Sequence, residues 1–256
     1  MDYQLSFEII ALLVAAGFLA AFIDSVVGGG GIISVPALLL AGLPPGIALG
    51  TNKLASTMSS LTSAASFYIS GKVEKRMALL LFPFAFAGSI IGAYVITFIP
   101  AEFLRPLVVL LLILMTLYTL FKKNLGRQTV AKRISFQLRM LITILVLIIG
   151  FYDGFFGPGT GSFFIFLMIY AGFDFVKAAG NAKVLNFGSN LAGLLTFAAL
   201  NHVNYIYGLI MGVSMVFGAL IGSRLAISTG VTYVRYLFII VTVLLIGTQI
   251  WYLIRA

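Results

Sequence analysis

Residues 22–31 read FIDSVVGGGG, an acid followed by four consecutive glycines inside an otherwise apolar stretch. Residues 151–161 read FYDGFFGPGTG and repeat this arrangement later in the chain. Consecutive glycines destabilise a helix, by about 1 kcal/mol each relative to alanine. We therefore expect an apolar helix to be interrupted at both places.

Other passages of the first half also recur in the second. GTNKL at 50–54 corresponds to GNAKV at 180–184, and GSIIG at 88–92 corresponds to GALIG at 218–222. The chain thus consists of two related halves. Duplicated halves with apolar segments interrupted at matching places are typical of secondary transporters, whose substrate site lies where the interruptions meet.

The composition indicates a helical membrane protein. Hydrophobic residues make up 61% of the chain and charged residues 9%, whereas soluble domains carry about 25% charged residues. The absence of cysteine and the single histidine exclude disulfides, thiolate metal sites and histidine-based zinc chemistry. We expect no cofactor and no metal.

The apolar segments predict five helical pieces in each half. They cover 7–27, 32–42, 46–70, 77–98 and 103–121, then 138–156, 161–172, 175–200, 205–227 and 233–254. The second piece of each half is too short to cross about 30 Å of hydrocarbon, so we predict half-helices or re-entrant segments there. The predicted organisation is a first membrane repeat (1–121), a basic cytoplasmic linker (122–137) and a second membrane repeat (138–256).

The net charge of +9 predicts orientation rather than nucleic-acid binding. Six of the sixteen basic residues lie between 122 and 139, and the connector 72–76 is also basic. Both therefore belong on the cytoplasmic side. The equivalent connector of the second half, 201–204, has no formal charge, which favours inverted over parallel repeats. This arrangement places both termini outside the cytoplasm, in a multi-pass protein of the inner or plasma membrane.

The two glycine runs are candidate anion sites. A half-helix that starts at glycines presents free N–H groups and the positive end of its dipole, and unwound backbone in a membrane is tolerated where it lines a cavity. The alternative is close helix packing through small residues, which we favour for the isolated pairs at 88/92 and 218/222. The predicted substrate-binding residues of the runs are Gly28, Gly29, Gly30, Gly31, Gly157, Gly159, Thr160 and Gly161.

Two lysines, Lys53 and Lys183, lie at equivalent positions within apolar segments. A charge deep in a membrane segment is a functional hypothesis by default, so we expect at least one of them to attract an anion. The alternatives are snorkelling to an interface, or structural pairing with Asp24 and Asp153 across the two halves. Proton coupling through these aspartates is a further, weaker alternative. The polar residues predicted to complete the site are Thr51, Asn52, Asn181, Asn186 and Asn190, with Ser56 and Ser189 nearby.

With these residues in place, the chain resembles the TauE/SafE family of membrane permeases. The passages 150–161 and 181–186 are similar to a signature of its "probable membrane transporter" branch. The resemblance covers nearly the whole chain. It implies a permease that moves sulfur-containing anions such as sulfite and sulfonates, and it carries over no catalytic residues.

The sequence therefore predicts a transporter of small anions such as sulfite, sulfonates or thiosulfate, with alternating access at a midplane site between the halves. An anion channel with a glycine-lined pore is the alternative. An enzyme is not expected, because the intramembrane acids occur singly and cysteine is absent. The expected partners are a small anion and the lipid bilayer, without nucleic acid; a homo-oligomer is one of the states that the sequence leaves open.

Overall fold

The computed structural model describes residues 6–121 and 136–229, and over these residues the chain forms helices and no strands. The all-α membrane fold predicted from the composition is confirmed. Most of the predicted linker 122–137 and the predicted last segment 233–254 lie outside the described residues. The predicted domain boundaries stay a prediction.

The helices follow the predicted apolar segments closely. The first half contains α1 (Phe7–Val27), α2 (Gly31–Leu40), α3 (Pro45–Ile69), α4 (Lys75–Ile96) and α5 (Ala101–Phe121). The second half contains α6 (Phe136–Phe155), α7 (Thr160–Tyr170), α8 (Phe175–Ala199) and α9 (Tyr205–Thr229). The short helices α2 and α7 end two residues earlier than predicted. The reason is that Gly42 and Gly172 follow them with φ of 89° and 97°, a conformation that ends a helix.

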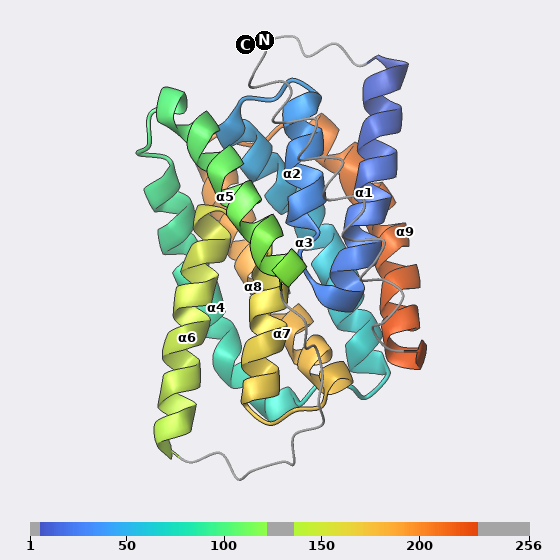
Figure 1. Cartoon of the computed structure of the whole chain (residues 1–256), viewed down its shortest axis with the longest axis vertical. Coiled ribbons are helices and arrows are strands. Elements are labelled where there is room, and N and C mark those ends of the chain that lie inside the picture. The colour runs from blue at the N-terminus through green and yellow to red at the C-terminus, as the bar shows by residue number, and fades with distance from the viewer. Residues whose placement is uncertain (1–5, 122–135, 230–256) are drawn as a thin grey trace.

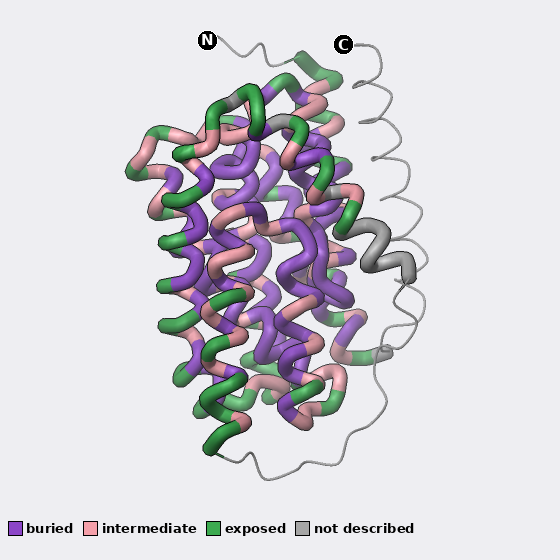
Figure 2. The backbone as a smooth tube through the Cα atoms, turned by 60° about the vertical axis from the view of Figure 1, so that its left-hand side comes forward, coloured by how far each residue is buried: buried purple, intermediate pink, exposed green. Residues whose placement is uncertain are grey.

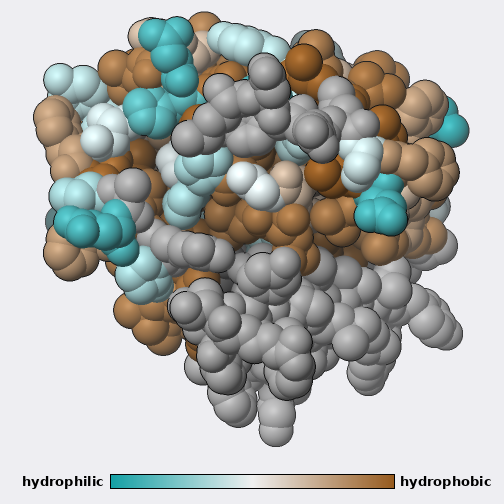
Figure 3. Space-filling view, turned by 90° about the horizontal axis from the view of Figure 1, so that it is seen from above, coloured by the Kyte–Doolittle hydropathy of each residue, from teal (hydrophilic) through white to brown (hydrophobic). Residues whose placement is uncertain are grey.

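Among the residues that the structure describes, four helices are long and apolar enough to cross a membrane, namely α1, α4, α6 and most of α9. They carry large exposed apolar side chains, for example Leu79, Ile144 and Phe217. Exposed residues lie along the outer side of the bundle in Figure 2 and buried ones in its middle. Seen from one end, the described surface is largely apolar, with polar side chains scattered over it (Figure 3). This distribution suits a bundle whose solvent is lipid.

The helices α3 and α8 are each 25 residues long but too polar to count as candidate spans. They pack against one another, α3 also against α9 and α8 also against α4. Their polar residues are therefore enclosed by the apolar helices, which is where polar groups in a membrane protein are tolerated.

The isolated glycine pairs lie at two of the contacts between the two halves, α4 against α6 and α1 against α9. A Cβ on Gly88 or Gly92 of α4 would collide with a backbone carbonyl of α6, and one on Gly218 or Gly222 of α9 with a carbonyl of α1. Small residues allow this close approach of helix backbones. The close-packing interpretation of these glycines is confirmed.

Equivalent helices run in opposite directions. In Figure 1, α1 descends from the end where the described chain begins, whereas α6 ascends from the opposite end. The loop after α3 lies against the start of α8, since a Cβ on Gly180 would collide with the Lys72 carbonyl. The loop after α8 lies against the start of α3, since a Cβ on Gly50 would collide with the His202 carbonyl. Opposed directions are what inverted repeats require, and they support that prediction.

Candidate functional site

Both glycine runs interrupt a helix. Between α1 and α2, Gly28 and Gly29 have φ of 78° and 96°, and between α6 and α7, Gly157 and Gly159 have φ of 97° and 88°. These values lie in the left-handed region that side chains with a Cβ disfavour, which is why glycine occupies the positions. Each half thus contains a helix that stops and restarts as a short helix.

The two interruptions touch each other. The Ser162 hydroxyl of α7 donates a hydrogen bond of 2.9 Å to the carbonyl of Val27, the last residue of α1. A Cβ on Gly31 would lie 2.9 Å from the Cα of Pro158, and one on Gly161 would lie 3.0 Å from the Cα of Gly28. The starts of α2 and α7 are therefore brought together from opposite halves.

Among the described residues, two lysines and two aspartates form two ion pairs that cross between the halves. Lys53 Nζ lies 2.9 Å from Asp153 Oδ1, and Lys183 Nζ lies 2.6 Å from Asp24 Oδ2. The side chains of Lys53 and Lys183 are 1% and 0% exposed. The pairing across the halves, one of the alternatives for these residues, is thus present. Removing one partner of such a buried pair strongly destabilises the folded protein, because the other partner is left without its counter-charge.

The two pairs differ in how the carboxylate is satisfied. Asp24 uses both oxygens, because its Oδ1 also accepts the Gly30 N–H at 3.1 Å. Asp153 is 2% exposed, and its Oδ2 has no hydrogen-bond partner among the described residues. Lys53 in turn has a second acceptor, since its ammonium donates to Asn190 Oδ1 at 3.2 Å.

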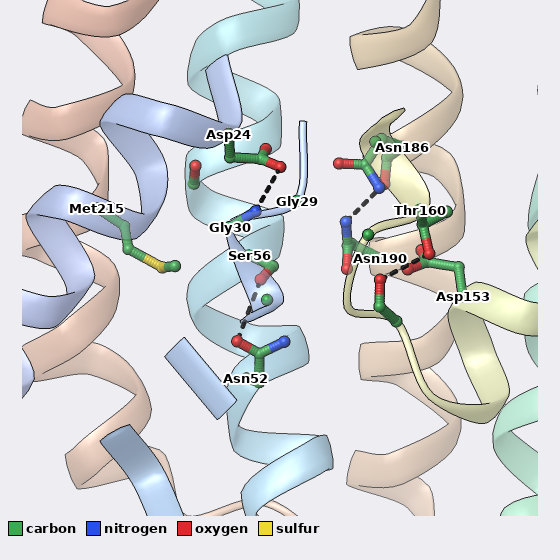
Figure 4. A pocket seen from close by; sticks show the side chains of 15 residues that line it. Asp24, Gly29, Gly30, Asn52, Ser56, Asp153, Thr160, Asn186, Asn190 and Met215 are labelled. Atoms are coloured by element: carbon green, nitrogen blue, oxygen red, sulfur yellow. Dashed lines mark hydrogen bonds between the residues drawn. The ribbon is translucent and has the colours of Figure 1, made fainter. Parts of the chain in front are cut away.

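A small cavity lies where the interruptions and the inner helices meet (Figure 4). Its volume is about 20 Å³, enough for roughly one water molecule. Figure 4 shows Asp24 and Gly30 on one side of it, and Asp153 and Thr160 on the other. The lining residues are Asp24, Gly29, Gly30, Gly31, Asn52, Ser56, Ser59, Asp153, Gly157, Gly159, Thr160, Gly161, Asn186, Asn190 and Met215.

Most of the residues predicted in or near the site are among those that line the cavity, and six are not: Gly28, Thr51, Lys53, Asn181, Lys183 and Ser189. Lys53 is nonetheless close behind the wall, because a Cβ on Gly157 would lie 3.1 Å from its Nζ. Lys183 is held at Asp24. The binding of a substrate by these residues stays a prediction.

Thr51 and Asn181 hold the loops of the opposite half. The Thr51 hydroxyl accepts the Asn204 N–H at 2.9 Å, and Asn181 Oδ1 accepts the Glu74 N–H at 3.0 Å. They occupy equivalent places in GTNKL and GNAKV and make equivalent bonds. Their position therefore indicates a structural task.

Sequence reasoning left two lining residues unnamed, Ser59 and Met215. Ser59 follows Asn52 and Ser56 at helical spacing, so the polar face of α3 could have revealed it. Met215 is an apolar residue in an apolar helix, and only the packing of α9 against α3 brings it to the cavity.

Comparison with known proteins supplies the family. The family model described as "Sulfite exporter TauE/SafE" matches residues 13–248. The chain belongs to the TauE/SafE family. This TauE/SafE protein is 40% identical to a "Probable membrane transporter protein" of Sinorhizobium, over 94% of its own length and 92% of the relative's. It is 34% identical to one of Haemophilus influenzae over 97% of both chains, and 36% identical to YfcA of Escherichia coli over 94% and 89%.

No solved structure matches this TauE/SafE protein. The family and the names of the relatives describe membrane transporters, and the apolar helices agree with a multi-pass membrane protein. The predicted family and the general function, membrane transport, are confirmed.

Proposed function

We propose that this protein transports small sulfur-containing anions, such as sulfite, thiosulfate or sulfonates, by alternating access at the cavity between the two halves. The observation that carries the proposal is the meeting of two helix interruptions from opposite halves around one polar cavity. The family description, sulfite exporter, supports sulfur-containing anions as the substrate class.

The starts of α2 and α7 supply the attraction for an anion. Gly30 and Gly31 lie at the start of α2, Gly159 and Thr160 at the start of α7, and all four line the cavity. Helix N-termini carry a partial positive charge and N–H donors that suit oxyanions. The side chains of Asn52, Ser56, Asn186 and Asn190 add polar groups around the same space.

The size of the cavity favours a carrier over the channel alternative. A space of about 20 Å³ holds roughly one water molecule, so an anion with several oxygen atoms needs the walls to move apart. Contacts between the halves at α1–α9 and α4–α6 give surfaces along which such a movement can occur. Movement of one half against the other is the usual mechanism of transporters with this organisation.

The proposed setting is the inner or plasma membrane, with both termini outside the cytoplasm. Basic side chains gather where α3 connects to α4, with Lys72 in the loop and Lys75 and Arg76 at the start of α4, and Arg139 lies in the first turns of α6. Figure 1 places the start of α6 and the α3–α4 loop at the same end. An excess of positive charge marks the cytoplasmic end.

Flux into proteoliposomes tests the proposal. Purified protein should take up labelled sulfite, thiosulfate or methanesulfonate with a saturable rate, and unlabelled anion inside the vesicles should accelerate the uptake. Chloride should not compete. Steady single-channel currents in a planar bilayer would establish the channel alternative, and the absence of flux for all three anions would refute the substrate class.

A further inference from the structure

We propose that Asp153 binds a proton together with the transported anion, whereas the equivalent Asp24 is structural. This inference rests on the proposed function and names its coupling ion. It comes from a difference between the two ion pairs, which the duplicated sequence does not show.

One carboxylate oxygen of Asp153 is buried without a hydrogen-bond partner among the described residues. Its Oδ1 pairs with Lys53, its Oδ2 has no hydrogen-bond partner among the described residues, and the residue lines the cavity. An ionised oxygen that is buried without a donor is unfavourable. A proton on Oδ2 removes that penalty, and a water molecule in the cavity can deliver it.

Asp24 lacks this feature. Its two oxygens accept from Lys183 and from the Gly30 N–H, and its side chain is 16% exposed. Protonation would weaken both hydrogen bonds, and one of them holds the start of α2. The ionised form is therefore the form that the structure of the first half supports.

Charge balance links the proton to the anion. The pair Lys53–Asp153 is neutral as it stands, so protonation of the carboxylate leaves the Lys53 ammonium without a counter-charge in a buried place. Asn190 Oδ1 still accepts from that ammonium, but an amide provides no formal charge. An anion in the cavity provides the negative charge that Lys53 then lacks, because Gly157, which lines the cavity, lies next to the ammonium. Proton and anion thus favour each other's binding, which is what coupled transport requires.

The charged and titratable groups around Asp153 are few. Lys53 faces it from α3, and Tyr152 precedes it on α6 with its hydroxyl bonded to the Pro158 carbonyl at 2.8 Å. From α7 and α8 the cavity receives Thr160 and Asn190, and α4 packs on this turn through Ser89 and Gly92; none of these carries a charge. Asp24, paired with Lys183, is the other carboxylate at the cavity. Of the two carboxylates that line the cavity among the described residues, Asp153 is the one with an oxygen available for the proton.

Methanesulfonate is the probe for the test, because it stays a monovalent anion at every pH used. In weakly buffered solution, binding of methanesulfonate to the wild-type protein should take up about one proton per anion. Because one proton accompanies each anion, the affinity for methanesulfonate should rise by up to about tenfold for each unit by which the pH falls. In proteoliposomes, an inward proton gradient should drive accumulation, and a potassium-valinomycin potential should not, because proton and monovalent anion together are neutral.

Two matched variants locate the proton. Asp153→Asn resembles the protonated form, so its affinity for methanesulfonate should be independent of pH and it should lose accumulation driven by the gradient. Asp24→Asn should keep the dependence on pH. The proton uptake measured on the wild type does not depend on either variant folding.

The outcomes separate the two proposals. Saturable exchange without proton uptake, or retained dependence on pH in Asp153→Asn, would overturn the role of Asp153 and leave anion transport standing. Absence of binding and exchange of methanesulfonate, sulfite and thiosulfate would refute the proposed function, and the coupling with it.

Discussion

The two halves of the molecule use the same residue types at equivalent positions and bond them differently. In the pair of Lys183 and Asp24, both carboxylate oxygens accept a hydrogen bond. In the pair of Lys53 and Asp153, one carboxylate oxygen has no donor among the described residues. The frame around both pairs is alike, with a helix interruption beside each acid. The comparison shows that the duplicated frame is retained while the chemistry at its centre has become unequal.

Removing a lysine should give the largest effect, and an unequal one. Lys53→Met leaves the Asp153 carboxyl group 2% exposed and without its cation, so we expect a loss of about 3–5 kcal/mol in the free energy of unfolding. Lys183→Met should lose less, because Asp24 keeps the Gly30 N–H and is 16% exposed. Unfolding of the detergent-solubilised protein measures both.

The matched double variant Lys53→Met/Asp153→Leu is the control for this difference, since removing both charges is often nearly neutral for stability. Equal losses in the two single variants would contradict the inequality of the pairs. A double variant as unstable as Lys53→Met would show that the loss of stability does not come from Asp153 being left without its cation.

Enlarging the packing glycines should affect both halves alike. Gly92→Val and Gly222→Val each place side-chain atoms against a backbone carbonyl of the facing helix, and overpacking of this kind destabilises by about 1–3 kcal/mol. Gly46→Ala is the control, because its Cβ would meet only ordinary contacts, the nearest at 3.4 Å from His202. Thermal unfolding of the three variants measures these effects. Destabilisation of only one of the two valine variants would contradict equivalent packing in the two halves.

Removing a loop bond should give a moderate loss of stability without altering substrate binding. Thr51→Val removes the acceptor for the Asn204 N–H, and Asn181→Leu removes the acceptor for the Glu74 N–H. We expect each to cost about 1–2 kcal/mol of unfolding free energy, with KM for the anion unchanged. A raised KM with unchanged stability would instead assign these residues to the substrate site.

Changing a cavity serine should give the smallest effect on the fold. Ser56→Ala removes one hydroxyl from the cavity wall, which corresponds to about 1 kcal/mol of anion binding or roughly a fivefold rise in KM. Ser66→Ala is the control, since that hydroxyl bonds within its own helix at 2.9 Å and lies away from the cavity lining. Equal KM values for the two variants and the wild type would remove Ser56 from the site.

Much of the fold follows from patterns that the sequence displays. Helix positions are predictable because apolar length and glycine interruptions act locally, so the segments at 7–27 and 205–227 agree with α1 and α9 within a few residues. The pairing of Gly88 and Gly92 with the facing helix also follows from spacing. Local physics suffices for these features.

The candidate site is less predictable, because it depends on which helices of opposite halves come together. Lys53 and Lys183 look like anion-binding residues in the sequence, yet each is neutralised by an acid from the other half. Thr51 and Asn181 lie close to these lysines in the chain, but their side chains accept hydrogen bonds from loops of the opposite half. Asp153 Oδ2 has no hydrogen-bond partner among the described residues. This feature depends on how the helices pack and cannot be predicted from the sequence.

A crystal structure with bound selenite, the selenium counterpart of sulfite, tests the central claim most directly. The account predicts an anomalous peak in the cavity between the starts of α2 and α7, within hydrogen-bonding distance of backbone N–H groups from both halves. A peak that contacts only one half, or that lies away from Gly31 and Gly161 at the starts of the two short helices, would contradict it.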